Sequence, residues 1–272
     1  MTAREIHLEI QKKGSCLCVG LDTDPSRLPS HFAGDPDAVF HFNKAIVEAT
    51  HDLAVAYKPN LAFYEATGAK GMVQLEKTVD FIRSLDPNLL IIADAKRGDI
   101  GNTADQYARS IFIHYDFDAV TLSPYMGRDS IDSFLKYDGK WAILLGLTSN
   151  PGSHDLQLNR LANGEPVFLY MIRKSAGWGS PENMMFVVGA THPDHLVQIR
   201  EVVPDHFLLV PGVGAQGGSL DMVLRYGMNA LTGLLINSSR AIIYAGSGPD
   251  FAEKARGAAL QNRSEMSPFL KK

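Results

Sequence analysis

The stretch "LLIIADAKRGDIGNTADQYARSIFIHYDFDAVTLSPY", Leu89–Tyr125, shows the alternation that decides the fold. It begins with an apolar run at Leu89–Lys96, which predicts a buried strand. Apolar residues at helical spacing follow in "TADQYARSIFIHY", and a second strand-like run follows at Asp118–Tyr125. Two strands separated by a helix are typical of a parallel sheet, because parallel neighbours need a long crossover connection.

The same alternation runs through the rest of the chain, with helical spacing in segments such as "DAVFHFNKAIVEATHDL" and "SLDMVLRYG". The further strands are expected at Cys16–Asp22, Val55–Asn60, Trp141–Ser149, Met184–Thr191, Phe207–Gly214 and Ala230–Ser239. Eight such units in about 250 residues, without a linker or a break in composition, predict a closed barrel. We therefore expect an α/β protein with a single (β/α)8 TIM barrel over residues 1–272. A doubly wound open sheet is the alternative.

The first residues, "MTAREIHLEIQKKG", predict an N-terminal amphipathic helix that ends at Gly14. They lack the apolar core of a signal peptide, and no apolar run reaches the roughly 18 residues of a membrane span. We therefore expect a cytoplasmic protein that makes no membrane contact. In such a reducing compartment, Cys16 and Cys18 of "SCLCVG" are expected to be buried thiols rather than a disulfide.

Composition limits the possible partners. The 272 residues are 45% hydrophobic and carry 26 basic and 30 acidic side chains, for a net charge of -4. This balance is that of an ordinary soluble globular protein with a large core. It includes no basic run of the kind that binds a polyanion, so no nucleic-acid partner is expected.

Ionisable residues gather where the expected strands end, and the carboxyl ends of barrel strands form the functional face. Asp94 and Lys96 are two residues apart on one strand, so their side chains point to the same side. Lys58 ends the neighbouring strand, and Asp99 follows closely in the loop. Because a buried charge costs several kcal/mol unless it is paired, alternating charges here predict a network that holds a lysine as proton donor. A structural ion-pair network is the alternative.

The last two strand ends predict a phosphate site. In "PGVGAQGG", residues 211–218, glycines let backbone N–H groups approach an anion, and Arg240 supplies a forked cationic donor. The segment also matches the dinucleotide pattern G-x-G-x-x-G. We reject that reading because the match lies near the end of the chain and no Asp or Glu follows about twenty residues later to bind a ribose. The expected ligand is a sugar phosphate.

Other short motifs favour no metal or nucleophile. His192 and His195 of "HPDH" are three residues apart and straddle an expected helix start, where Pro193 fits the first turn. We therefore expect a capping segment and no metal site. No H-E-x-x-H, C-x-x-C or G-x-S-x-G pattern occurs. Ser149 has no evident base nearby in the sequence, so we expect it to bind a ligand by hydrogen bonding.

Several blocks together carry a family resemblance. "DAKRGDIGNT" resembles the D-x-K-x-x-D signature of the orotidine 5'-phosphate decarboxylase family, and "VGLD", "YKPN", "GLTSNPG", "PGVGAQGG" and Arg240 resemble its other blocks in order. The match spans about Cys16–Ala245. A long segment between strands five and six, Pro151–Gly179, is similar to the longer bacterial branch of the family. The resemblance implies a homodimeric barrel that makes UMP and CO₂ from orotidine 5'-phosphate in pyrimidine synthesis, without a cofactor.

The resemblance also implies a role for each residue of the charged network. Lys96 would be the proton donor, with Asp94 beside the departing carboxylate and Lys58 completing the group. Asp99 of the partner subunit would enter the same site, so that the active site is shared across the dimer interface.

Substrate-binding roles follow from the same resemblance. The residues that would hold substrate are Asp22 (ribose hydroxyls, with Lys58), Ile100 of the partner subunit and Thr103 of the partner subunit (base and ribose), Ser149 (pyrimidine edge), and Gln216, Ser239 and Arg240 (phosphate). Strand eight departs from the expected pattern, because "INSSR" stands where many members have a glycine just before the arginine. Asn237 and Ser238 receive no role.

Two alternatives remain open. Mg²⁺-dependent keto-sugar-phosphate decarboxylases and hexulose-phosphate synthases of the same superfamily share D-x-K-x-x-D but typically have an acid on strand two, where this chain has Lys58. A non-catalytic nucleotide-binding barrel is disfavoured because Lys58, Asp94, Lys96 and Asp99 are all retained.

Overall fold

The computed structural model describes residues 1–190, 193–213 and 219–270. Within these residues, parallel strands pair in sequence order and close into a barrel. The strands are β1 (Leu17–Leu21), β2 (Ala54–Pro59), β3 (Leu90–Arg97), β4 (Ala119–Leu122), β5 (Trp141–Leu147), β6 (Met184–Val188), β7 (Phe207–Pro211) and β8 (Leu234–Ser238). β8 pairs with β1, for example Val19 with Ser238. The predicted (β/α)8 barrel is therefore confirmed, and the open doubly wound sheet is excluded.

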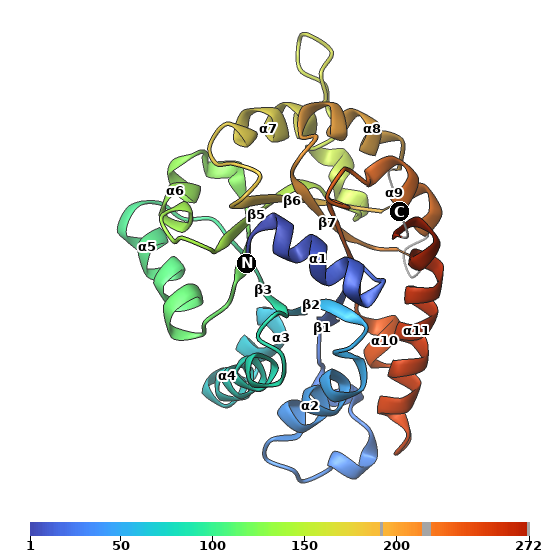
Figure 1. Ribbon diagram of the computed structural model, residues 1–272. Helices are drawn as coiled ribbons and strands as arrows, with labels where there is room; N and C mark the ends of the chain where they lie inside the picture. Colours follow the sequence, from blue (N-terminus) through green and yellow to red (C-terminus); the bar gives the residue numbers. More distant parts are fainter. Residues whose placement is uncertain (191–192, 214–218, 271–272) are drawn as a thin grey trace.

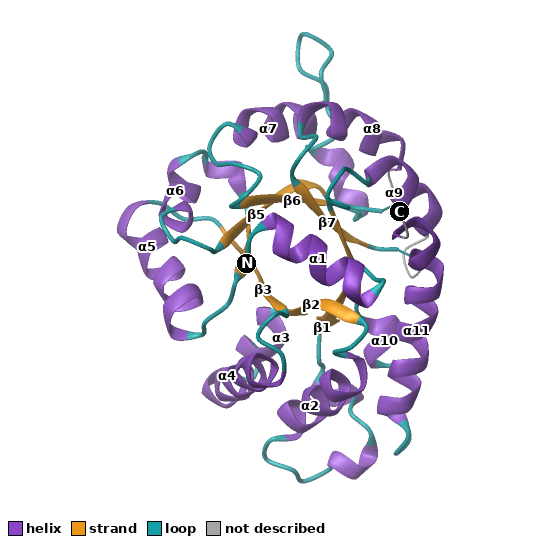
Figure 2. Cartoon of the chain, in the orientation of Figure 1, coloured by secondary structure: helices purple, strands orange, loops and turns teal. Residues whose placement is uncertain are grey.

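Helices surround the barrel on all sides, as Figures 1 and 2 show. They are α1 (Ala3–Lys13), α2 (Ala38–Thr50), α3 (Leu61–Glu65), α4 (Gly68–Leu85), α5 (Gly101–Arg109), α6 (Asp129–Leu135), α7 (Val167–Ala176), α8 (Pro193–Val202), α9 (Leu220–Gly227), α10 (Arg240–Ile243) and α11 (Phe251–Leu270). Because helices cover the outer face and side chains fill the interior, the strands are buried on both faces, which explains their nearly continuous apolar runs.

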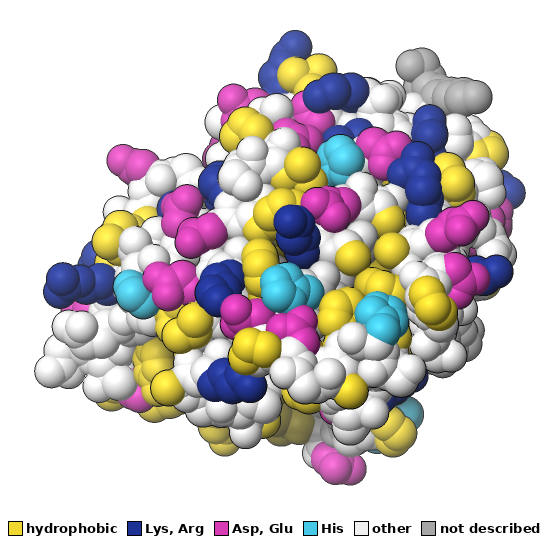
Figure 3. Space-filling view, turned by 90° about the horizontal axis from the view of Figure 1, so that it is seen from below, with side chains coloured by type: hydrophobic (Ala, Val, Ile, Leu, Met, Phe, Trp, Pro, Cys, Tyr) yellow, Lys and Arg dark blue, Asp and Glu magenta, His cyan; other side chains and the backbone are white. Residues whose placement is uncertain are grey.

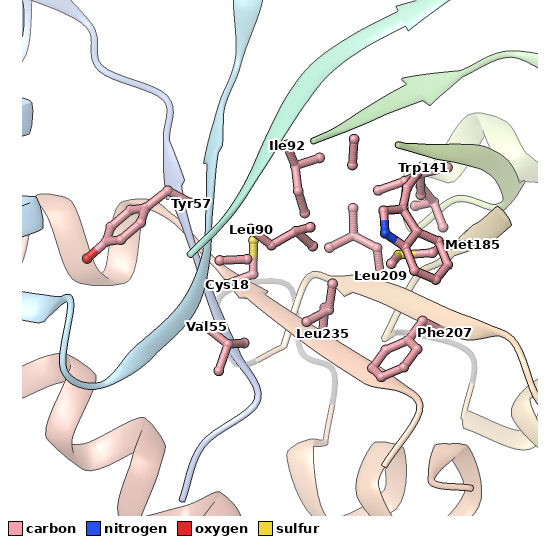
Figure 4. Packing of buried hydrophobic residues seen from close by; sticks show 14 of the residues in the cluster. Cys18, Val55, Tyr57, Leu90, Ile92, Trp141, Met185, Phe207, Leu209 and Leu235 are labelled. Carbon is pink, nitrogen blue, oxygen red and sulfur yellow. The ribbon is translucent and has the colours of Figure 1, made fainter. Parts of the chain in front are cut away.

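The barrel interior is a packed core. Figure 4 shows Ile92, Leu209 and Leu235 pointing toward one another from different strands, whereas Tyr57 points outward. The Tyr57 hydroxyl lies 2.7 Å from Thr50 Oγ1 on α2, so its polar end has a partner between strand and helix. Because side chains fill the barrel interior, functional groups can gather at the ends of the strands.

Helix α1 lies across the amino-terminal end of the barrel (Figure 1). Thr2 and Glu5 form a capping box at its start, and Gly14 ends it in the left-handed conformation at φ 60°. The predicted N-terminal helix is thus confirmed. The thiols of Cys16 and Cys18 that follow are buried and free, and burial raises the pKa of each to about 12.

The boundaries of several elements differ from the predicted ones. β4 ends at Leu122 because Pro124 begins a 3₁₀ turn, and β8 begins at Leu234 because Asn229 and Thr232 form a turn with reciprocal backbone hydrogen bonds of 3.1 Å. The expected helix at 103–115 begins earlier, at Gly101, and continues after α5 as a π-helical turn, η3 (Ser110–His114). These boundaries depend on turn geometry rather than on hydrophobic periodicity.

The described helices include none that is long and apolar enough to cross a membrane. On the face shown in Figure 3, acidic and basic side chains are interspersed. This arrangement agrees with the mixed charge expected from the composition.

Candidate active site

Three charged side chains meet at the carboxyl end of the barrel, as the sequence predicts. Lys58 Nζ lies 2.7 Å from Asp94 Oδ2, and Lys96 Nζ lies 2.5 Å from Asp94 Oδ1. Lys58 lies near the end of β2, and Asp94 and Lys96 lie near the end of β3. One carboxylate thus bridges two ammonium groups, and each of its oxygens pairs with one of the two.

Burial and charge oppose each other at this cluster. Burial by itself raises the pKa of Asp94, but the charges of Lys58 and Lys96 outweigh it and hold the pKa well below its ordinary value. Burial likewise lowers the pKa of Lys58, but the carboxylates of Asp94 and Asp22 outweigh it and leave that pKa above its ordinary value. Lys58 and Asp94 are therefore both ionised at neutral pH.

Lys96 differs from Lys58 in its exposure and its backbone. Its side chain is 52% exposed, whereas that of Lys58 is 6% exposed. Its φ of 47° lies in the left-handed region, which a non-glycine residue adopts only at a cost. Thr121 Oγ1 on β4 accepts the backbone N–H of Lys96 at 3.0 Å. Sequence reasoning missed Thr121, because a threonine within an apolar strand looks like any other β-branched residue.

Asp22 follows β1 and accepts a hydrogen bond from Ser239, which follows β8. Ser239 Oγ donates to Asp22 Oδ2 at 2.7 Å, while Asp22 Oδ1 is buried and has no hydrogen-bond partner among the described residues. A Cβ at Gly20 would lie 2.7 Å from Ser239 Cβ, which explains the glycine of "VGLD". Asp22 Oδ1 is thus an acceptor available to a ligand hydroxyl.

Two adjoining cavities extend from the charged cluster. One, of about 160 Å³, includes Asp22 and Arg240 in its lining. The other, of about 330 Å³, includes Lys96 and Ser149 and has mainly apolar walls from Leu145, Val187 and Leu209. Both are lined by Lys58, Asp94 and Pro211, so they form one cleft. The cleft therefore has Arg240 in one part, Lys58 and Asp94 where the two cavities join, and mainly apolar walls in the other part.

The apolar end is closely packed around Ser149, which follows β5. A Cβ at Gly189, after β6, would lie 2.8 Å from both the N and the Cβ of Ser149. Gln157, from the long segment between β5 and β6, accepts the Thr148 backbone N–H at 2.8 Å. That segment therefore supports the wall of the cleft beside Ser149, while its tip, near Arg160–Pro166, projects away from the barrel (Figure 1).

Some expected site residues are not brought into the cluster. Asp99 Oδ1 accepts the backbone N–H of Ile100 at 2.8 Å, and within the described part of the chain Asp99 makes no ion pair with either lysine of the cluster, both of which pair with Asp94. Ile100 and Thr103 are exposed on the rim. These positions leave the assignment to a partner's site as a prediction.

Strand eight contributes side chains that sequence reasoning left without a role. Asn237 and Ser238 are buried and line the smaller cavity beside Ser239 and Arg240. Gln216 lies outside the described residues, so its expected phosphate contact stays a prediction. No feature of "INSSR" by itself indicates that its asparagine faces the cleft.

The "HPDH" segment begins a helix, as expected. α8 starts at Pro193, and His192 lies outside the described residues. Among residues 1–190, 193–213 and 219–270, no group of three or more His, Cys, Asp or Glu is placed to hold a metal ion.

Comparison with known proteins gives one consistent family. Residues 15–255 match the orotidine 5'-phosphate decarboxylase / HUMPS family. The orotidine 5'-phosphate decarboxylase of Bacteroides fragilis is 55% identical over 271 residues, covering 100% of this chain and 99% of that protein. The enzyme of the same name from Flavobacterium johnsoniae is 52% identical over 271 residues, covering 99% and 98%. A solved Leishmania donovani OMP decarboxylase is 36% identical, covers 99% of both chains and has a TM-score of 0.85.

Proposed function

The chain belongs to the orotidine 5'-phosphate decarboxylase / HUMPS family, and we propose that it converts orotidine 5'-phosphate to UMP and CO₂ in pyrimidine synthesis. The observation that carries the proposal is the Lys58–Asp94–Lys96 cluster at the centre of a cleft with Arg240 at one end. Relatives at 50% identity and above carry the decarboxylase name. That name favours the decarboxylase over the Mg²⁺-dependent alternatives.

The chemical step needs stabilisation of charge at one ring carbon. Loss of CO₂ from C6 of the pyrimidine leaves an electron pair in the plane of the ring, outside the π system. The ammonium of Lys96 stabilises this pair as it forms and then protonates C6. Preorganised charge of this kind supplies much of the rate enhancement of many enzymes. Asp94 lies beside the departing carboxylate, and the repulsion between them is relieved as CO₂ leaves.

The remote parts of the substrate orient the ring. We assign the ribose hydroxyls to Asp22 and Lys58, the pyrimidine edge to Ser149, and the phosphate to Arg240 with Ser239 and Gln216. Asp22 Oδ1, which has no hydrogen-bond partner among the residues that the structure describes, supports the ribose assignment. Binding energy from the phosphate, far from C6, can be used to order the charged groups around the reacting carbon.

We propose a homodimer with a shared active site. Tyr125, 82% exposed, lies with Met126 and Ile100 on loops beside the mouth of the barrel, so large apolar side chains face outward there. Exposed apolar groups of this kind commonly mark an interface. A second copy that covers them brings Asp99 of the partner subunit toward Lys96, which would explain why Asp99 has no ion-pair partner within its own described chain.

The deciding experiment measures CO₂ release from orotidine 5'-phosphate by the purified protein in EDTA. Turnover that chelation leaves unchanged supports the proposal. Absence of turnover, or turnover only after Mg²⁺ is added, contradicts it. A parallel assay with a hexulose phosphate tests the Mg²⁺-dependent alternative directly.

A further inference from the structure

We propose that Thr121 is a positioning residue, whose hydroxyl holds Lys96 and Asp94 in their reactive arrangement. Thr121 lies on β4 and is 1% exposed, although it contributes to the wall of the larger cavity. The inference rests on the proposed decarboxylase function, because it assigns Thr121 to the groups that stabilise and protonate C6.

Hydrogen-bond counting determines which way the Thr121 hydroxyl points. Its oxygen accepts the backbone N–H groups of Ala95 and Lys96, each at 3.0 Å. A hydroxyl has two lone pairs and one proton, so both lone pairs are used. The remaining proton is donated to Asp94 Oδ1, 3.0 Å away. Oδ1 is also the oxygen that contacts Lys96 Nζ at 2.5 Å. Thr121 therefore binds the backbone of the proton donor and the carboxylate that orients it.

The register of β3 and β4 shows why this contact is needed. Ala93 pairs with Val120 and Arg97 pairs with Leu122, so three residues of β3 lie opposite Thr121 alone. Such bulges re-aim side chains and often occur beside active sites. Within the bulge, Lys96 has the unfavourable φ of 47°. The bulge directs both Asp94 and Lys96 into the mouth, and the Thr121 hydroxyl replaces the strand acceptor that the backbone N–H groups of Ala95 and Lys96 have lost.

The chemistry of the side chain makes the inference testable with near-isosteric changes. Valine keeps the shape of threonine but has no acceptor for the two N–H groups and no donor for Asp94. Serine keeps the hydroxyl and loses only a methyl group. Thr78 on α4 is a matched control, because it is also 1% exposed and its hydroxyl donates to Gln74 O at 2.7 Å, away from the cleft.

The experiment compares Thr121→Val, Thr121→Ser and Thr78→Val by steady-state kinetics and by NMR exchange of backbone amides. A small misplacement of reacting groups can cost about 100-fold in rate. We expect a loss of that order in kcat for Thr121→Val, with KM changed less than about threefold because the substrate contacts remain. Thr121→Ser should recover most of the rate, and Thr78→Val should retain it. The Ala95 and Lys96 amides should exchange at least about tenfold faster in Thr121→Val alone, since only that variant removes their acceptor.

Each result decides for or against the inference. A Thr121→Val enzyme with near-normal kcat overturns it, as does a rate loss that Thr78→Val shares or that Thr121→Ser does not relieve. Unchanged exchange at Ala95 and Lys96 also overturns it. If the wild-type protein releases no CO₂, the proposed function fails. The amide exchange then decides separately whether Thr121 holds the bulge.

Discussion

Lys58 Nζ and Asp94 Oδ2 lie 2.7 Å apart, and both side chains are almost fully removed from solvent. Removing one member of a buried pair leaves an uncompensated charge, which is far more destabilising than losing a surface ion pair. The cluster that we assign to catalysis is therefore also linked to the stability of the barrel.

The first prediction concerns Asp94→Asn. At pH 7 we expect a loss of about 3 kcal/mol in the free energy of unfolding, because the change leaves the buried ammonium of Lys58 without the carboxylate that offsets its desolvation. The folded pKa of Asp94 lies below the ordinary value of 3.8. As the pH falls from about 5 toward that folded pKa, the unfolded wild-type chain binds a proton that the folded chain does not, and stability is lost.

Asp94→Asn should therefore lose less stability between pH 5 and pH 3 than the wild type, as measured by denaturant unfolding at each pH. Asp250→Asn is the control, since the Asp250 carboxylate is 52% exposed and pairs with Lys254. It should change stability by less than about 0.5 kcal/mol. Parallel pH profiles for wild type and Asp94→Asn would contradict the prediction.

The second prediction concerns Lys96→Ala. Turnover should fall by several orders of magnitude while UMP binding survives, because the change removes the cation beside C6 and the proton donor. Single-turnover CO₂ release and UMP titration measure the two effects. Lys254→Ala, whose native side chain is 60% exposed, is the control and should turn over normally. A rate within tenfold of wild type would rule out this role for Lys96.

The third prediction concerns Arg240→Ala. Loss of a charge contact to a bound phosphate should weaken substrate binding by about 2–5 kcal/mol. The phosphate-free nucleoside never makes that contact, so its binding or turnover should hardly change. The control is Arg225→Ala, in which the exposed guanidinium that pairs with Asp221 is removed. An equal loss for both ligands would show that Arg240 does not recognise phosphate.

The fourth prediction tests the shared site. Lys96→Ala and Asp99→Ala homodimers should both be nearly inactive. When they are co-expressed, random pairing makes about half the dimers mixed, and each mixed dimer has one intact site if Asp99 acts across a two-fold interface. Activity should therefore recover to about a quarter of wild type. Verified mixed dimers that stay inactive would place Asp99 in its own subunit's site.

The fifth prediction concerns Gly189→Ala. The added Cβ would meet the backbone and Cβ of Ser149 at 2.8 Å, so the segment that follows β5 must shift. We expect weaker binding of the pyrimidine and a lower kcat/KM. Gly257→Ala on α11 is the control, because its added Cβ meets nothing within 4 Å. It should raise stability by about 0.5–1 kcal/mol through helix propensity. Normal kinetics of Gly189→Ala would contradict the prediction, because the cleft wall beside Ser149 would then accommodate the added methyl group.

The sequence predicts the barrel and much of its rim because both follow from local patterns. Strand–helix alternation determines the order of the elements. Alternation along β3 also predicts that Asp94 and Lys96 share a side, and they do meet, although a bulge rather than regular pleating brings them together. Thr121 could not be found in this way. Its role depends on a bulge between β3 and β4, which periodicity does not encode.

Contacts between segments that are far apart in the sequence could not be predicted either. Gly20 of β1 meets Ser239, after β8, only when these two strands close the barrel, and Gly189 meets Ser149 only when β6 pairs with β5. Ser239 stands where many family members have a glycine, and only the structure shows that its hydroxyl donates a hydrogen bond to Asp22. A single folded chain leaves Asp99 at the rim, so its proposed entry into a partner's site stays a prediction.

Both described ends of the chain lie at the closed end of the barrel, away from the cleft. The Met1 carbonyl accepts a hydrogen bond from Trp141 Nε1 at 2.9 Å, and Leu270 lines a cavity together with His7 of α1. Surface attachment through this end would leave the mouth open to solution. Because both described ends lie on this side, the fold suits circular permutation: a peptide across this end could join them, and new termini could be opened at the exposed tip around Asn163.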